Sequence, residues 1–191
     1  MTLAQRTATA GCLLTLLLGA AACDAGTTAA PPAATASSAA PGSAGFFGGT
    51  DLAWVEITIA MNEEMLPLLD LVPTHSSDAG VKALAAEVRA FHGQELLTLR
   101  RLHDQAKLPA ENPHKGMPMP GMVTPDQVIQ AAAVRGPAFD KLLIRHLQAH
   151  FEHGAKLAES EKKAGVEPQT KALATDVISS REKYLAKLAA R

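Results

Sequence analysis

The region after residue 50 contains one pattern twice, and this repeat limits the folds that the chain can adopt. Asp51 corresponds to Asp140, and Lys82–Ala85 corresponds to Lys171–Ala174, at a gapless offset of 89 residues. Each half contains two long segments with apolar residues at helical spacing, which predicts one helical hairpin per half. Because two hairpins can bury their apolar stripes against each other, we expect an all-α fold, an antiparallel four-helix bundle.

Capping residues and prolines indicate where the helices begin and end. Thr124 and Gln127 have the spacing of a capping box, with Pro125 at the first helical position. Pro67 removes a backbone donor and should kink the first helix. The predicted helices span residues 50–71, 76–107, 124–134, 136–164 and 168–189, and residues 108–136 form a long crossover between the hairpins.

The composition excludes several classes of function. The 18 Lys and Arg residues balance 19 Asp and Glu residues, so no basic field is available to hold nucleic acid. Both cysteines, Cys12 and Cys23, precede the predicted bundle, which therefore has no thiolate nucleophile and no cysteine zinc site. Since no GxSxG, P-loop or dinucleotide motif is present either, we expect that the protein is not an enzyme.

The N-terminus predicts export. Arg6 precedes an apolar run, residues 11–22, which is too short to span a bilayer and is typical of a signal peptide. The run ends in Ala20-Ala21-Ala22-Cys23, which resembles the lipobox of bacterial lipoproteins. Residues 1–23 are therefore a predicted lipoprotein signal, with acylation at Cys23. The alternatives are ordinary cleavage near the alanines, which would give a secreted protein, and an uncleaved anchor.

Residues 24–49 are predicted to be a flexible tether. They consist of Ala, Gly, Pro, Ser and Thr, with Asp24 as the single charge and Phe46 and Phe47 as the only large apolar side chains. Such a segment buries too little surface to offset the entropy of ordering. We therefore expect that residues 50–191 form a domain tethered to the outer face of the bacterial cytoplasmic membrane by its lipid.

Several ligand-type or charged residues fall on the apolar faces of the predicted helices. Glu95 shares such a face with His92, and a buried carboxylate needs a partner, which Arg181 on the last helix can supply. The pair is predicted to be structural; a metal-ligand role for Glu95 is the alternative. Met61 and Met65, four residues apart on the first helix, are candidate metal ligands together with His92; the alternative for the methionines is core filling, their usual role at helical spacing.

Three histidines follow one side of the predicted helix 136–164. His146, His150 and His153 have the spacing i, i+4, i+7, at which two imidazoles can share a metal ion. The alternative is that they are surface histidines or core histidines with internal hydrogen bonds.

The crossover contains the densest group of soft ligands. Met117, Met119 and Met122 follow His114 closely, in a segment whose prolines and glycines prevent a core helix. Thioethers select Cu(I) and, unlike thiolates, survive in an oxidising compartment. The segment therefore predicts a Cu(I) site, with His114 or a bundle histidine as a further ligand. Alternatively, the methionines pin the loop across the bundle.

A combination of motifs resembles the bacterial family called domain of unknown function 305, over about residues 50–190. The motifs are Asp51–Trp54, Val81–Ala85 with Glu95-Leu96, Met119–Thr124, Gly136–Asp140 and His150. The resemblance implies an exported, ferritin-like four-helix bundle, and copper binding through Met and His residues, as in some members.

The resemblance also implies ligands that this chain lacks. The family carries a Met-Ile-x-His-His run in each half, whereas residues 58–62 read Thr-Ile-Ala-Met-Asn and residues 147–151 read Leu-Gln-Ala-His-Phe. Three of the four motif histidines are therefore absent. Met61 supplies another ligand suited to copper, and His146 and His153 accompany His150.

Two functions remain open from the sequence. The first is binding of copper or another transition metal for buffering or delivery, with a metal-transfer protein as partner. The second is a non-metal structural or interaction module of the cell envelope. A ferritin-type di-iron oxidase is excluded because its Glu-x-x-His pairs lie on helices, whereas Glu111 and His114 lie in a proline-flanked loop.

Overall fold

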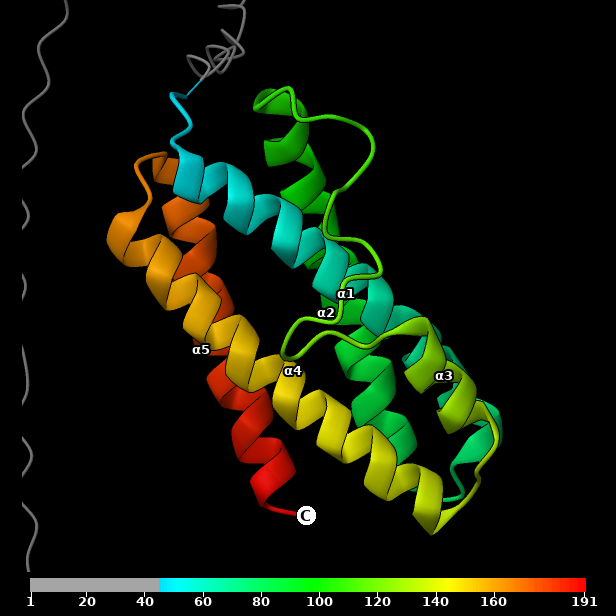
Figure 1. Cartoon of the computed structure of the whole chain (residues 1–191). Coiled ribbons are helices and arrows are strands. Elements are labelled where there is room, and N and C mark those ends of the chain that lie inside the picture. The colour runs from blue at the N-terminus through cyan, green and yellow to red at the C-terminus, as the bar shows by residue number, and fades with distance from the viewer. Residues whose placement is uncertain (1–44) are drawn as a thin grey trace, which may run out of the picture. The chain divides into compact units, whose positions relative to one another are not determined.

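The computed structural model describes residues 45–191, so the predictions for the signal peptide, for Cys23 and for most of the tether lie outside the described residues. Within that range the chain forms helices and no strands (Figure 1), which confirms the all-α class. The helices are α1 (Gly49–His75), α2 (Ala79–Gln105), α3 (Pro125–Ala132), α4 (Pro137–Ala164) and α5 (Pro168–Ala189). Across residues 45–191, none of them combines the length and apolar character that a membrane crossing requires.

The four long helices form two hairpins that follow the sequence repeat. α1 pairs with α2, α4 pairs with α5, and α1 also packs along α4, while short α3 lies against α1 (Figure 1). The backbones of α2 and α5 approach each other less closely, and side chains join them. Lys187 Nζ lies 2.6 Å from both carboxylate oxygens of Glu87, and the rings of Phe91 and Tyr184 are 5.4 Å apart.

Most helix boundaries agree with the sequence signals. Asp78 caps α2 by accepting a hydrogen bond from Val81 N at 2.8 Å. Thr124 and Gln127 form the predicted capping box at the start of α3. The predicted ends of α4 and α5 are also found, because glycine and proline stop or start a helix through local backbone chemistry alone.

The boundaries of α1 differ from the prediction at both ends. Gly48, not Thr50, is the N-cap, because its N–H donates to the Asp51 carboxylate at 2.7 Å and leaves Thr50 inside the helix. At the other end α1 continues past Pro67 to His75. The side chains beyond this proline pack into the apolar core, which stabilises the additional turn.

Two apolar clusters fill the bundle. One surrounds Leu68, Val88 and Phe139, at the end where α1 turns into α2. The other surrounds Trp54 and Leu99, at the end where α4 turns into α5. Along each long helix, polar side chains lie between the two clusters.

Candidate metal centre

One or two polar side chains from each long helix meet between the apolar clusters. They are Asn62 from α1, His92 and Glu95 from α2, His150 from α4 and Arg181 from α5, and we call them the polar layer. None is more than 5% exposed. A buried polar group without a partner costs about 1–3 kcal/mol, so the contacts inside this layer decide what it can do.

Glu95 and Arg181 form the ion pair expected between the two hairpins. Arg181 Nη2 lies 2.7 Å from Glu95 Oε1, and both side chains are almost fully buried. Asn62 Nδ2 donates to the same oxygen at 2.7 Å. The guanidinium carbon also lies 5.4 Å from the ring centre of Phe91 and 5.6 Å from that of Phe151. The carboxylate and the two ring faces together stabilise a cation that is removed from water.

His92 and His150 face each other across the layer, with ring centres 4.9 Å apart. His150 Nδ1 lies 3.2 Å from the carbonyl oxygen of Gly121 and donates to it, because a carbonyl can only accept. This tautomer leaves a lone pair on His150 Nε2. That atom and both ring nitrogens of His92 have no hydrogen-bond partner. The two imidazoles therefore offer unused nitrogen ligands, one of them oriented by a carbonyl as in many metal sites.

Both imidazoles are held in the neutral form. Burial lowers the pKa of His150 to about 3, and the Arg181 cation acts in the same direction. Burial also lowers the pKa of His92 well below 6.5, with contributions from His150 and Arg181. Because a metal ion binds only neutral imidazole, these nitrogens remain competent ligands in mildly acidic solution.

The crossover places two of its methionines beside this layer. Met122 is 4% exposed and packs in one cluster with Met61 of α1, which is 2% exposed. Met119 is half-buried and packs against the same cluster. The structure therefore brings together three thioethers from two segments that are distant in the sequence. We call Met61, Met119 and Met122 the methionine cluster.

Gly121 joins the methionine cluster to the histidines. Its φ of 77° lies in the left-handed region, and a Cβ there would come within 2.9 Å of Ala149 O and 2.7 Å of His153 Cβ. The same Cβ would be 3.2 Å from Met61 Cε. Only glycine lets the crossover approach α4 so closely, and this approach delivers the carbonyl that holds His150.

The other predicted ligands are more exposed than the polar layer. Met117 is 46% exposed, and His114 is half-buried in a turn of the crossover. His146 and His153 are half-buried on α4, whereas the Gly121 carbonyl and the His92 ring hold His150 in the core. Within residues 45–191, there is no group of three or more His, Cys, Asp or Glu side chains that could hold a metal ion together. The sharing of a metal ion by two of the three α4 histidines stays a prediction.

Met65, the other candidate ligand on α1, lies in the apolar core. It is fully buried in the cluster that contains Leu68. Two members of the site were not predicted from the sequence, namely Asn62 and Gly121. The Pro-Gly pair at residues 120–121 indicates a turn, but no sequence signal identifies the helix that this turn touches.

A separate group of buried carboxyl groups holds the α4–α5 turn on α1. Asp51 Oδ1 accepts hydrogen bonds from Val166 N and Glu167 N, each at 3.0 Å, and all three carboxyl groups of Asp51, Glu161 and Glu167 are buried. Burial raises the pKa of Glu161 to about 8, and the neighbouring Asp51 carboxylate adds to this rise. Glu161 is therefore protonated at neutral pH, and this group serves to dock two segments.

Solved structures share this fold. A DUF305 protein from Streptomyces coelicolor, described as secreted, is 19% identical, with 73% of this chain and 90% of that chain covered and a TM-score of 0.65. A DUF305 fragment from Deinococcus radiodurans is 12% identical, with 75% and 95% covered and a TM-score of 0.67. CopM in its Cu(I)-bound form is 17% identical, with 74% and 94% covered and a TM-score of 0.62. No curated protein gives a significant match.

A family model covers nearly all of the described helices. It matches residues 51–190, from the first turn of α1 to the residue after α5, and so includes the crossover and the polar layer. The resemblance inferred from the motifs is confirmed by this match, and the chain belongs to the DUF305 family, a domain of unknown function.

Proposed function

We propose that this protein binds copper outside the cytoplasmic membrane and buffers or delivers it, through the methionine cluster and the neighbouring histidines. The observation that carries the proposal is a cluster of three methionines that Gly121 joins to His150, whose ring, like that of the neighbouring His92, has unpartnered nitrogen. One solved protein of the same fold is named in its Cu(I)-bound form, which supports the choice of metal.

The chemistry of these side chains favours Cu(I) over harder ions. Thioethers and neutral imidazoles are the ligands that a soft monovalent ion prefers, and carboxylates, which suit harder ions, are almost absent. Glu95, the acidic member of the polar layer, is already paired with Arg181. Because this pair is neutral overall, the layer supplies no net negative charge. A monovalent cation therefore loses less free energy on entering than a divalent cation does.

The crossover provides a surface for exchange of the metal. Met117 is exposed two residues before the half-buried Met119, and Met122 follows in the core. A Cu(I) ion delivered by a partner protein can meet Met117 first and then pass to the methionine cluster. Anchoring through Cys23 would hold this surface outside the membrane. The exposed thioether is the point at which we expect a metal-transfer partner to act.

Competition for Cu(I) between the full chain and a chromophoric chelator tests the proposal. Met61→Leu and Met122→Leu keep apolar volume but remove a thioether, so we expect each to weaken Cu(I) binding by about tenfold or more. Met65→Leu is the matched control, because Met65 is equally buried but lies in the apolar core. Since thioethers do not titrate and burial lowers the pKa of His150 to about 3, binding should persist between pH 7 and 5.

Two outcomes contradict the copper proposal. One is equal Cu(I) affinity for the Met61→Leu and Met65→Leu variants, which would leave the methionine cluster as packing only. The other is the absence of Cu(I) binding by the wild-type chain, which would favour a non-metal interaction module of the cell envelope.

A further inference from the structure

Two large apolar side chains lie exposed at the end of the bundle where α1 begins. Phe46, just before α1, is 82% exposed, and Val166, in the turn between α4 and α5, is 53% exposed. A Cβ on Gly45 would lie 2.7 Å from Glu167 Oε1, and a Cβ on Gly48 would lie 3.0 Å from Val166 Cγ2. The segment before α1 therefore runs along this turn (Figure 1), and it brings Phe46 to the same end of the bundle as Val166.

The fold fixes both positions. The N–H groups of Gly48 and Val166 donate to the Asp51 carboxylate, at 2.7 Å and 3.0 Å. Phe47 packs against the apolar cluster at this end, whereas Phe46 stays outside it. Since water surrounds most of the Phe46 side chain, transfer of its ring to apolar surroundings would be favourable.

The charged side chains at this end are sorted by sign. Three carboxyl groups hold the turn from inside and are all buried: Asp51, Glu161 and Glu167. Lys162 and Lys163, in the last turn of α4, are exposed. Earlier on α4, the exposed Glu159 is offset by the exposed Lys156. The outer surface next to the two apolar side chains is therefore basic.

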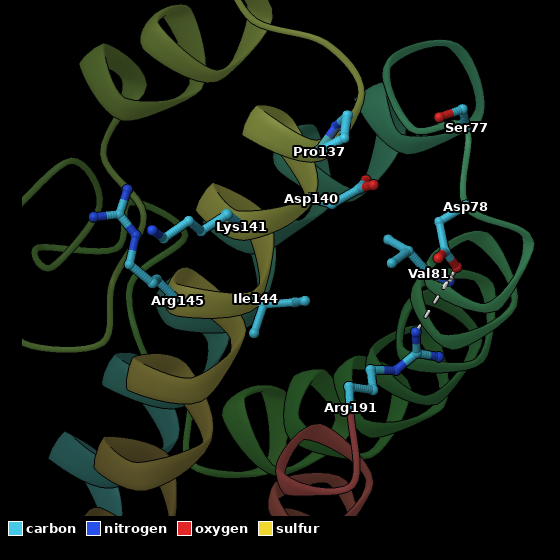
Figure 2. A pocket seen from close by; sticks show the side chains of 9 residues that line it. All are labelled: Ser77, Asp78, Val81, Pro137, Asp140, Lys141, Ile144, Arg145 and Arg191. Atoms are coloured by element: carbon cyan, nitrogen blue, oxygen red, sulfur yellow. Dashed lines mark hydrogen bonds and ion pairs between the residues drawn. The ribbon is translucent and has the colours of Figure 1, made fainter.

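The equivalent turn of the other hairpin lacks this character. At the offset of 89 residues, Val166 corresponds to Ser77 and Glu167 corresponds to Asp78. Figure 2 shows Ser77 and Asp78 at a hollow beside the start of α2, where Asp78 Oδ1 lies 4.0 Å from Arg191 Nη1. The Asp78 side chain is 57% exposed, so that turn presents polar and acidic groups. The apolar and basic surface is particular to the end at which the chain enters the bundle.

We propose that this end of the bundle docks on a bilayer that contains anionic phospholipid. Its docking face consists of Phe46, Val166, Lys162 and Lys163. The two apolar side chains enter the boundary between headgroups and acyl chains, while the lysine ammonium groups reach the lipid phosphates. The docking face lies outside the polar layer and the methionine cluster, so the proposal does not depend on copper.

The composition of the docking face favours lipid over protein as its occupant. A stable protein interface buries about 800 Å² on each partner around a well-packed apolar centre, for which two apolar side chains are too few. A bilayer needs no matching shape, and each lysine near its surface adds attraction to anionic headgroups. Residues 24–44 join this face to Cys23, the predicted site of acylation. Such an anchor would hold the docking face at high effective concentration beside the bilayer.

Fluorescence quenching by brominated acyl chains tests the proposal. A chain of residues 23–191 keeps every described helix, and Cys23 is its only thiol. It can therefore be coupled at Cys23 to a maleimide phospholipid in vesicles, whether or not the natural protein is acylated. Phe46→Trp places an indole on the docking face, while the native Trp54 is only 3% exposed. Leu97→Trp is the control, because Leu97 is 61% exposed on α2, outside the docking face.

In vesicles of equal parts dibromo-phosphatidylcholine and phosphatidylglycerol, we expect quenching of the first introduced indole and not of the second. Charge variants separate docking from simple closeness to the tether. Lys162→Gln with Lys163→Gln should lower the ratio of docked to free chains about fivefold per lysine, and quenching of the Phe46→Trp indole should fall accordingly. Lys82→Gln with Lys141→Gln removes the same charge from exposed positions at the other end and should leave quenching unchanged.

Three results overturn the proposal. The first is equal quenching of the Phe46→Trp and Leu97→Trp indoles. The second is equal quenching for the two lysine pairs, or with and without phosphatidylglycerol, which would show that the tether alone brings the indole to the membrane. The third is a dimer of the uncoupled chain in sedimentation equilibrium that Phe46→Ser dissociates, which would assign the docking face to a second copy of this chain.

Discussion

Glu161 is the side chain whose ionisation should affect stability most directly. Burial raises its pKa from 4.5 to about 8, so the unfolded chain releases a proton that the folded protein keeps. Because the buried neutral His92 and His150 lower stability below about pH 6.5, the effect of Glu161 should appear above that pH, where stability should fall by about 1 kcal/mol per unit as the pH rises toward 8. Glu161→Gln does not titrate. Denaturant melts at pH 6.5 and pH 8 should show a smaller decline for this variant.

The exposed neighbour Glu159 provides the control for this measurement. Glu159→Gln makes the same substitution on the same helix, at an exposed position. Its pH profile should follow that of the wild type. Parallel declines for the Glu161→Gln variant and the wild type would show that the buried carboxyl group does not carry a raised pKa.

Between helices, the Glu95–Arg181 pair should link α2 to α5 in a non-additive way. Removing one partner leaves an uncompensated buried charge, so Glu95→Gln or Arg181→Met should cost about 3–5 kcal/mol, and the double variant should cost less than the sum. Urea melts of the three variants measure this coupling. Arg89→Met is the control: Arg89 is 2.6 Å from Asp70, but both are over half exposed, so the cost should stay below about 1 kcal/mol. Additive losses at Glu95 and Arg181 would refute the coupling.

The contact of the crossover with α4 depends on Gly121. Gly121→Ala would place a Cβ 2.9 Å from the Ala149 carbonyl oxygen, whereas Gly116, with a similar φ of 78°, has open space around its Cβ position. Both variants should lose about 1–2 kcal/mol from the left-handed backbone, and Gly121→Ala should lose more. Thermal melts and Cu(I) titrations compare the two. Equal effects on stability and on copper affinity would show that the close approach to α4 is unimportant.

The helices could be predicted because their signals are local, as with the capping box at Thr124 and Gln127. The site could be predicted only in part. The helical spacing placed Glu95 and Arg181 on the apolar faces of two helices. Their pairing could be predicted because a buried carboxylate needs a partner. The carbonyl partner of His150, by contrast, lies 29 residues away on a loop, and its position depends on contacts that no local pattern encodes. The packing of Met122 against Met61 likewise depends on contacts between segments that are distant in the sequence.

For the complete chain, we expect Cys23 to decide where the domain resides. Cys23→Ala should release the protein from the membrane fraction or leave the precursor unprocessed, because the acylated residue is lost. Cys12→Ala is the matched control, since Cys12 lies in the part removed with the signal, and it should leave anchoring intact. Membrane fractionation and electrophoretic migration measure both. A Cys23→Ala variant that behaves as the wild type would rule out the lipoprotein interpretation.

The unequal content of the two hairpins has a consequence for assembly. At the repeat offset, His92 corresponds to Arg181 and Glu95 corresponds to Tyr184, so the ion pair joins positions that are not equivalent in the two halves. A hairpin paired with a copy of itself would bury either two carboxylates without a cation or two guanidiniums without an anion. Each half is therefore selective for the other, and the chain could be divided in the crossover into two fragments that recognise each other but not themselves.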